Sequence, residues 1–221
     1  ANLLFLHWEF PADSIQSRLP EGLFVDTFEG QAYMGVVPFF MKKVRPSYLP
    51  SLPGISWFQE LNLRTYVFDK HGNPGVWFFT LDCNQWLAVK IARALFSLPY
   101  NHASMQSKQE SNQLVYTSRR RGDVEDQIFH YPESTESTEE APLGSLEFFL
   151  LERYRLFSQS RNGSIYQGMV HHKPYQFQHI AQSVQPTRLF SLCGFEEPNQ
   201  PPVSSIVAKS VSVKIHPLAR A

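Results

Sequence analysis

The sequence predicts an α+β fold in which a predominantly antiparallel sheet forms a cone- or barrel-like core with few helices. Two observations support this class. Short apolar or alternating runs separated by turn signals dominate the chain, and the strand–helix–strand rhythm of a parallel sheet is absent. Several predicted strands also carry polar residues on a face flanked by aromatic stretches. That arrangement favours a closed sheet around a ligand-sized cavity.

The strands are predicted from alternation and from the turn residues between them. A first strand covers residues 3–10, with His7 and Glu9 on its polar face. Further strands and hairpins are expected in the stretches 23–44 (turning at Glu29-Gly30), 60–83 (turning at Lys70–Pro74), 103–131, 164–172 and 210–215.

Three segments have helical signals. A short helix lies within 11–22 and is closed by Pro20 and Gly22. The stretch 84–97 is amphipathic, with Asn84 as its expected N-cap. A third helix is expected over 145–157, where apolar residues recur at helical spacing.

We expect one domain over residues 1–221, because no linker separates two cores and no internal repeat occurs. At 221 residues with 43% hydrophobic content, the chain can bury a sizeable core. The acidic, low-complexity segment 132–145 is expected to be an exposed mobile loop within this domain.

Composition limits the partners. The 20 basic residues balance the 20 acidic ones, which disfavours nucleic acid and acidic membranes as partners. The run "SRRR" at 118–121 is followed at once by "GDVED" and is interpreted as a solvated strand end. No apolar run reaches the roughly 18 residues that span a bilayer, and no secretory signal is seen. With only two cysteines, we expect reduced thiols and a cytoplasmic location. The sequence leaves open whether the protein forms a homo-oligomer.

Standard catalytic and metal motifs are missing from the sequence. There is no glycine-rich phosphate loop and no Gly-x-Ser-x-Gly elbow, which disfavours common nucleotide-binding enzymes and serine hydrolases. The adjacent His171 and His172 would point to opposite faces of a strand, so they fit one metal poorly. We therefore expect no metal and no cofactor.

One predicted strand carries a row of chemically useful side chains. In "FQELNLRTYVFD", Glu60, Asn62, Arg64 and Tyr66 share one face. This pattern alone fits a solvated face as well as a cavity wall. If the face lines a cavity, Arg64 and Asn62 would bind a carboxylate or carbonyl, and Glu60 would serve as acid or base.

Five stretches closely resemble the YqjF-like family of uncharacterised proteins, which is similar to acetoacetate decarboxylase. They are "LLFLHWEFP", "LPEGLFVDTFEGQAYMGVVPFFMKKVRP", "LPGISWFQELNLRTYV", "GVWFFTLDCNQWLAVKIARALFSLPYNHASM" and "GSLEFFLLERYRLF". The resemblance implies a cone- or barrel-like antiparallel sheet around a central cavity.

The resemblance also implies a site. In the decarboxylase, an arginine-led segment ends in two lysines, the first of which forms a Schiff base with a β-keto acid. Here Arg93 leads into Leu98-Pro99, and Tyr100 and Asn101 stand where the lysines would be. A phenol and an amide cannot form an imine. Tyr100 is therefore expected to act as a hydrogen-bond or proton donor opposite Glu60, the loose counterpart of a decarboxylase glutamate.

The expected catalytic residues are thus Glu60 and Tyr100. The expected ligand-binding residues are Asn62, Arg64, Arg93, Asn101 and His102. The expected ligand is a small organic acid, because a guanidinium pairs well with a carboxylate. Three hypotheses remain: an enzyme acting on a small keto acid by acid–base chemistry without an imine, a protein that binds or senses such an acid, and a scaffold with a filled core.

Overall fold

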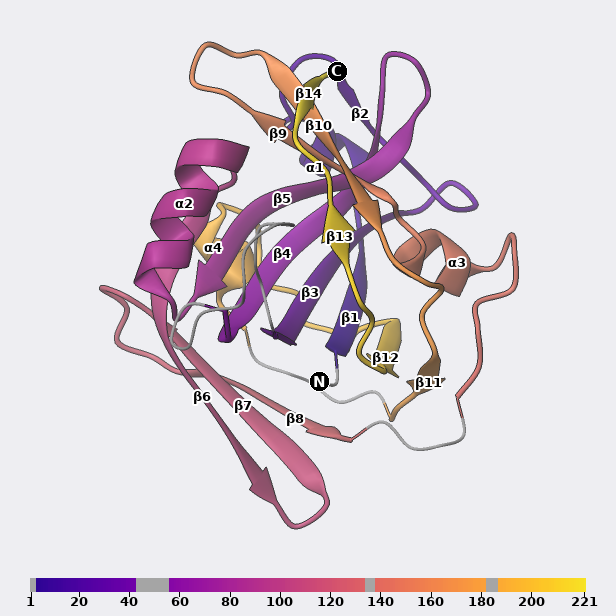
Figure 1. The fold of residues 1–221 in the computed structure, drawn as a ribbon. Helices are drawn as coiled ribbons and strands as arrows, with labels where there is room; N and C mark the ends of the chain where they lie inside the picture. The colour runs from indigo at the N-terminus through magenta and orange to yellow at the C-terminus, as the bar shows by residue number, and fades with distance from the viewer. Residues whose placement is uncertain (1–2, 43–55, 134–137, 182–186) are drawn as a thin grey trace.

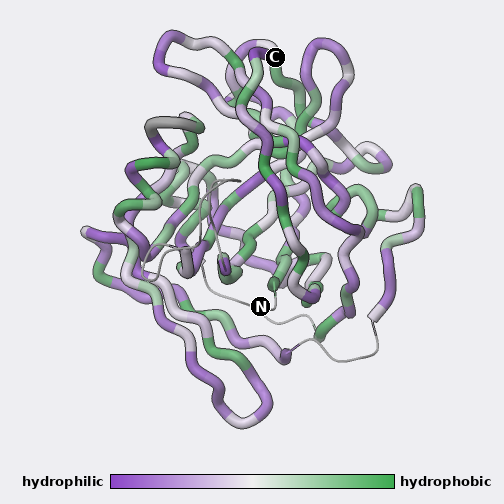
Figure 2. The backbone as a smooth tube through the Cα atoms, in the orientation of Figure 1, coloured by the Kyte–Doolittle hydropathy of each residue, from purple (hydrophilic) through white to green (hydrophobic). Residues whose placement is uncertain are grey.

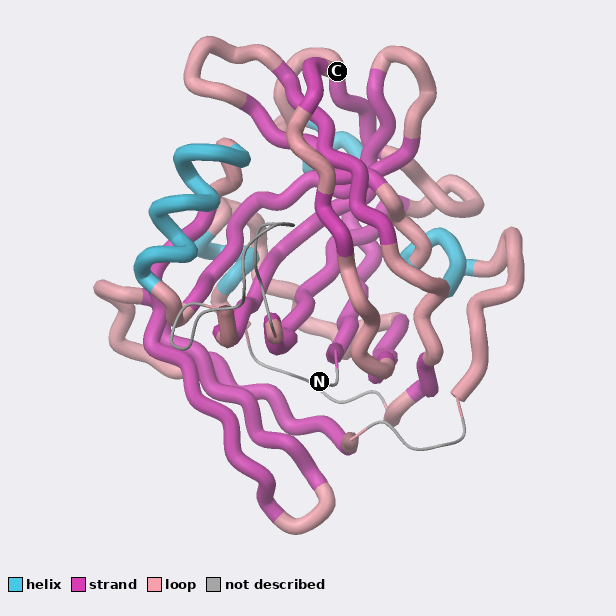
Figure 3. The backbone as a smooth tube through the Cα atoms, in the orientation of Figure 1, coloured by secondary structure: helices cyan, strands magenta, loops and turns pink. Residues whose placement is uncertain are grey.

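The computed structural model describes residues 3–42, 56–133, 138–181 and 187–221. Within these residues, fourteen strands form one sheet that curls into a half-barrel, with four helices packed against it (Figures 1 and 3). The predicted α+β class with a predominantly antiparallel, barrel-like sheet is confirmed. The sheet is nevertheless mixed, because β5 (Pro74–Cys83) runs parallel to both β6 (Tyr100–Glu110) and β9 (Arg155–Gln159).

The wall of the half-barrel is a run of neighbouring strands. In spatial order they are β11 (Phe177–His179), β12 (Ser204–Ala208), β1 (Leu3–Phe10), β3 (Ala32–Met41), β4 (Phe58–Asp69), β5 (Pro74–Cys83), β6 (Tyr100–Glu110), β7 (Gln113–Arg120) and β8 (Gln127–Pro132). The remaining strands pair off this path: β2 (Leu23–Val25), β9 (Arg155–Gln159), β10 (Ile165–His171), β13 (Lys214–Ile215) and β14 (Ala219–Arg220). In Figure 1, β10 and β13 cross in front of β3 and β4.

Both faces of the central strands are buried. One face of β4 contributes Leu61 and Leu63 to the largest apolar core, together with Leu6 of β1. The opposite face of the sheet packs Phe5 and Tyr66 into two further apolar clusters. Apolar and polar residues therefore alternate along strands that have little contact with water (Figure 2).

The helix α2 (Trp86–Phe96) ends in the bend that the sequence singled out. Gln85, rather than the expected Asn84, caps its start, with Oε1 accepting from the Leu87 amide at 3.2 Å. Asn84 instead accepts from the Gln59 amide at 2.9 Å. Ser97 ends the helix in the left-handed region, with φ of 50°. β6 then begins at Tyr100, earlier than the predicted position 103, and runs parallel to β5.

Three other predictions need correction. The stretch 23–44 is not a hairpin, because β2 pairs with β4 while the turn closes only through a Phe28–Gln31 bridge. The third predicted helix is shorter, since α3 covers only Leu146–Leu151 and the chain returns to the sheet as β9. The strand expected over 210–215 shrinks to β13, and β12 just before it was missed.

Of the remaining elements, α1 (Ala12–Gln16) is the short helix expected within 11–22. The single-turn helix α4 (Leu189–Leu192) and the short strands β11 and β14 were not predicted. In the acidic segment 132–145, residues 134–137 lie outside the described part of the chain, and Glu139 bridges to Phe177. No helix among the described residues is long and apolar enough to cross a membrane.

A buried ion pair joins the strands β6, β7 and β8, called the arm below, to the rest of the wall. Arg120 of β7 donates from Nε to Asp82 of β5 at 2.9 Å and from Nη2 to Thr80 at 2.7 Å. Asp82 is fully buried, and burial raises its pKa despite the adjacent guanidinium. Because an unpaired buried carboxylate is costly, this contact stabilises the junction between the arm and the barrel.

We predict that Arg120→Ala lowers the free energy of unfolding by about 3 kcal/mol, because it leaves Asp82 buried without a partner. The matched control is Arg119→Ala, whose exposed guanidinium lies 3.7 Å from Asp126 and whose loss costs under about 0.5 kcal/mol. Urea denaturation at pH 7 measures both. Equal effects of the two substitutions would show that the buried pair does not stabilise the junction.

Candidate functional site

Glu60 is the first residue of the buried polar row of β4, which continues with Asn62 and Arg64. Glu60 is only 3% exposed. Tyr100 of β6 donates its hydroxyl to Glu60 Oε2 at 2.7 Å, and the Asn62 side chain also hydrogen-bonds to the carboxyl. Tyr116 donates to the main-chain carbonyl of Glu60 at 2.9 Å and fixes the strand from its other side. The expected pairing of Glu60 with Tyr100 is present.

The environment changes the acidity of this pair. Burial raises the pKa of Glu60 from 4.5 to about 7, although the hydrogen bonds from Tyr100 and Asn62 oppose the rise. Burial and the charge of Glu60 raise the pKa of Tyr100 well above its usual value of 10. Tyr100 therefore remains a proton-bearing donor, while Glu60 can hold or release a proton near neutral pH.

The bend after α2 brings Tyr100 to Glu60. Arg93 donates from Nε to the Tyr100 carbonyl at 2.6 Å, which ties the last turn of the helix to the first residue of β6. The amide of Leu81 donates to the Pro99 carbonyl at 3.1 Å and starts the parallel pairing with β5. Parallel partners share a face, so Tyr100 points to the same side of the sheet as Leu81 and its neighbour Asn62.

Arg64 lies two positions beyond Asn62 on the same face. Its Nη2 donates to the Leu150 carbonyl of α3 at 3.1 Å, and its guanidinium stands over the Phe5 ring at 5.2 Å. Within the described residues Arg64 makes no ion pair with a carboxylate. A partly buried cation is thus held by a carbonyl and aromatic rings, with its charge unbalanced.

His7 is a member of this cluster that the sequence did not identify. It is fully buried on β1, and its Nε2 lies 2.8 Å from the Tyr66 hydroxyl. That hydroxyl also donates to the Leu150 carbonyl at 2.9 Å. Burial, and secondarily the charge of Arg64, lowers the pKa of His7 well below 6.5, so its ring is neutral. The sequence placed His7 on the polar face of the strand 3–10 together with Glu9, and that pattern alone does not show that His7 is buried.

Several polar atoms of this face have no hydrogen-bond partner although they are buried. They are Asn62 Oδ1, Arg64 Nε and His7 Nδ1. Unpaired buried polar atoms are uncommon in folded proteins and are costly to maintain. Such atoms would be satisfied by a polar ligand, and the group includes both donors and an acceptor.

Three predicted site residues do not join the cluster. Arg93 is exposed and acts on the Tyr100 main chain, as described above. Asn101 points to the opposite side of β6 and donates to Thr80 Oγ1 at 2.9 Å. His102 lines a hollow of about 250 Å³ with Ser104 and Arg119 on the arm. The strand alternation that aims Tyr100 at Glu60 turns Asn101 away.

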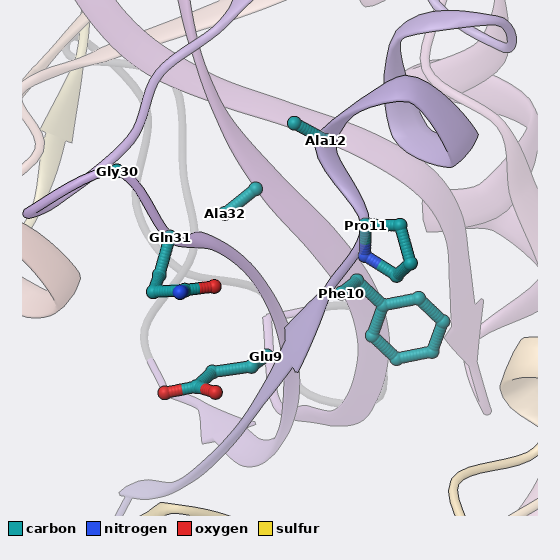
Figure 4. Close-up of a pocket in the computed structure, with 7 residues that line it drawn as sticks. All are labelled: Glu9, Phe10, Pro11, Ala12, Gly30, Gln31 and Ala32. Atoms are coloured by element: carbon teal, nitrogen blue, oxygen red, sulfur yellow. The ribbon is translucent and has the colours of Figure 1, made fainter.

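A second hollow, of about 300 Å³, lies at the end of β1. Figure 4 shows Glu9 and Gln31 on one side of it and the ring of Phe10 on another. Both hollows are separate from the Glu60 cluster. Among the described residues, no group of three His, Cys, Asp or Glu side chains is placed to hold a metal ion.

Comparison with protein families shows that residues 1–212 match the model of DUF2071, described as an uncharacterized conserved protein. The chain is 37% identical over 222 residues to the uncharacterized protein YqjF of Bacillus subtilis (strain 168), covering 99% of this chain and 89% of that protein. The resemblance inferred from the sequence motifs is confirmed.

Solved structures with a similar fold are distant in sequence. Acetoacetate decarboxylase from Legionella pneumophila has a TM-score of 0.68 at 11% identity, covering 100% of this chain and 84% of that one. An acetoacetate decarboxylase-like enzyme from Sphingomonas wittichii RW1 has a TM-score of 0.67 at 12% identity, covering 100% and 90%. The enduracididine biosynthesis enzyme MppR complexed with pyruvate has a TM-score of 0.64 at 12% identity, covering 99% and 87%.

The raised pKa of Glu60 predicts a specific pH dependence of stability. Between pH 4.5 and about 7 the folded state keeps a proton that the unfolded state releases. The free energy of unfolding of the wild type therefore falls by about 3 kcal/mol, because of Glu60, as the pH rises through that window. Glu60→Gln has no such proton to lose, so its stability relative to wild type improves by about 3 kcal/mol between pH 4 and pH 8. Urea denaturation at each pH measures the difference.

The matched control for this prediction is Glu196→Gln, which alters an exposed carboxyl group. Its stability relative to wild type should change little over the same pH range, because an exposed carboxyl has similar surroundings in the folded and unfolded states. If the Glu60→Gln difference is as flat as this control, the folded protein does not hold Glu60 protonated.

Proposed function

The chain belongs to the DUF2071 family of uncharacterised proteins, and we propose that it binds a small keto acid on the buried face of β4 and acts on it without a Schiff-base lysine. The observation that carries this proposal is the buried Glu60–Tyr100 pair at 2.7 Å. It combines a carboxyl group whose pKa is about 7 with a phenol that stays protonated. Acid–base catalysis at neutral pH needs groups of this kind.

The proposed chemistry is proton transfer next to a carbonyl group. Tyr100 turns its hydroxyl from Glu60 to the carbonyl oxygen of the ligand. The freed carboxylate of Glu60 then takes a proton from the adjacent carbon, and the electron pair of that C–H bond moves toward the carbonyl oxygen. The hydrogen bond from Tyr100 stabilises the negative charge that develops there. The product is an enolate, and the reverse step returns the proton.

Charge supports an acidic ligand. Arg64 lies on the same face with an unpaired Nε and no carboxylate partner among the described residues. An anionic ligand would balance this charge. A fold neighbour, MppR, has been solved with the keto acid pyruvate, which agrees with a ligand of this class.

The alternative is a protein that binds or senses the same acid without chemistry. It is favoured by the presence of Tyr100 and Asn101 where the decarboxylase resemblance leads one to expect lysines. The two functions differ in whether Glu60 exchanges a proton with the ligand.

We predict that the wild-type protein accelerates exchange of the protons beside the ketone of pyruvate or 4-oxopentanoate in D2O. Glu60→Gln and Tyr100→Phe should slow that exchange by about 100-fold or more, since each removes one group of the acid–base pair. Glu196→Gln is the matched control and should exchange at the wild-type rate. Proton NMR follows the loss of signal, and calorimetry measures binding. Binding of the acids without accelerated exchange would establish the non-catalytic alternative instead.

We predict that borohydride traps no adduct when the wild-type protein is incubated with either keto acid. Imine formation needs a neutral amine, and Lys90 of α2, the last lysine before Tyr100 in the sequence, is exposed with Nζ 4.1 Å from the Trp86 ring. Tyr100→Lys, which puts an amine beside Glu60, serves as the positive control and should gain one adduct. Intact-mass analysis shows whether an adduct has formed. A stoichiometric adduct on any lysine of the wild type would restore an imine mechanism.

A further inference from the structure

Four residues lie at one level across four neighbouring strands, beyond the Glu60–Tyr100 pair. Ser204 of β12 is opposite His7 of β1, His7 is opposite Gly35 of β3, and Gly35 is opposite Arg64 of β4. Residues in register on adjacent strands share a face of the sheet. The row therefore sets Ser204, His7 and Arg64 side by side, with a gap in the side-chain layer at Gly35.

Gly35 makes this arrangement possible. A Cβ atom at this position would lie 3.1 Å from His7 Cδ2 and 3.6 Å from Arg64 Cγ. The imidazole thus leans over β3 into space that any other residue would fill. The ring of His7 on β1 therefore reaches toward Arg64 on β4, with only β3 between the two strands.

Each of the three side chains is anchored or buried, yet each has an unsatisfied polar atom. His7 is held through Nε2 by Tyr66, and its Nδ1 has no partner. Arg64 is held through Nη2 by the Leu150 carbonyl, and its Nε has no partner. Ser204 is 5% exposed, and its Oγ has no partner. Together they supply up to three donors from fixed positions.

Among the described residues, no carboxylate forms an ion pair with the guanidinium of this row. Arg153, whose guanidinium stands 5.4 Å from the Tyr66 ring, is already paired with Asp26 at 2.7 Å. Glu152 accepts from the Tyr175 amide at 2.9 Å and from the Tyr154 hydroxyl. Neither Asp26 nor Glu152 forms an ion pair with Arg64. A row of buried donors that includes a guanidinium without a paired carboxylate suits a carboxylate ligand.

We propose that His7, Ser204 and Arg64 hold the carboxylate of the ligand, with His7 donating from Nδ1. This inference rests on the proposed function and deepens it, because it assigns the acid end of the ligand to this row and the ketone end to Glu60 and Tyr100. The required tautomer forms when the Tyr66 hydroxyl, 2.8 Å from His7 Nε2, turns its one proton from the Leu150 carbonyl to that nitrogen. Arg64 Nη2 continues to satisfy the Leu150 carbonyl at 3.1 Å.

The test compares two acids with their neutral amides: pyruvate with pyruvamide, and 4-oxopentanoate with 4-oxopentanamide. His7→Gln keeps an amide near the Nε2 position facing Tyr66 but loses the Nδ1 donor, whereas His7→Asn keeps a donor near Nδ1. We expect His7→Gln to weaken binding of the acids by about 10- to 100-fold, the range for a lost hydrogen bond to a charged group. Binding of the amides should change by less than about threefold, and His7→Asn should bind the acids more tightly than His7→Gln.

A second pair of variants tests the inference without touching the buried imidazole. Ser204→Ala removes a donor from the row and should weaken binding of the acids by about 10-fold. Ser205→Ala is the matched control, because Ser205 Oγ is equally buried and unpartnered but its register partner Leu6 belongs to the opposite, apolar core. Ser205→Ala should bind the acids as the wild type does. Calorimetry gives each dissociation constant, and thermal unfolding checks that each variant is folded.

The outcomes separate this inference from the proposed function. If the wild type prefers acids to amides and both His7→Gln and Ser204→Ala bind them as the wild type does, the carboxylate lies elsewhere and the inference fails alone. Equal losses in Ser204→Ala and Ser205→Ala would also overturn it, because the effect would then come from packing. Failure of the wild type to bind either acid would contradict both proposals.

Discussion

The burial of both faces of β4 is the constraint on which the rest of the structure depends. Leu61 and Leu63 occupy the apolar side, so Glu60 and Arg64 must lie on the other side, which is also covered. Burying polar groups is unfavourable unless they are hydrogen-bonded. The bend after α2 supplies Tyr100 to Glu60, and α3 supplies the Leu150 carbonyl to Arg64. The covering elements thus provide partners as well as apolar surface.

Several polar atoms of this face nevertheless have no partner. The unpaired atoms of the face are spread along β4 and across to β1 and β12, at Asn62, Arg64, His7 and Ser204. A scaffold with a filled core would be more stable with apolar residues at these positions. Polar groups that weaken the fold in the absence of a ligand are typical of binding and catalytic sites. This favours the two ligand-dependent functions over the scaffold.

The sequence predicted the shared face of Glu60, Asn62 and Arg64 because strand alternation is local. It could not decide whether that face meets water, since this depends on α3 and on strands far along the chain. His7 was missed for the same reason: its partners are Tyr66 and the space over Gly35. The hairpin over 23–44 was wrongly predicted because the turn at Glu29-Gly30 has the residues of a hairpin turn. β2 pairs instead with β4, which follows β3 in the sequence.

The acidity of Glu60 bears on the choice between catalysis and binding. A protein that only carries an acid gains nothing from a second carboxyl group beside it, because an ionised Glu60 would repel the ligand. A glutamine could accept the Tyr100 hydrogen bond equally well and would avoid the cost of about 3 kcal/mol of ionising a buried group at neutral pH. A base, in contrast, must be able to release and regain a proton near the working pH. With a pKa of about 7, Glu60 meets that requirement. The presence of a carboxyl group at this position therefore favours an enzyme over a carrier.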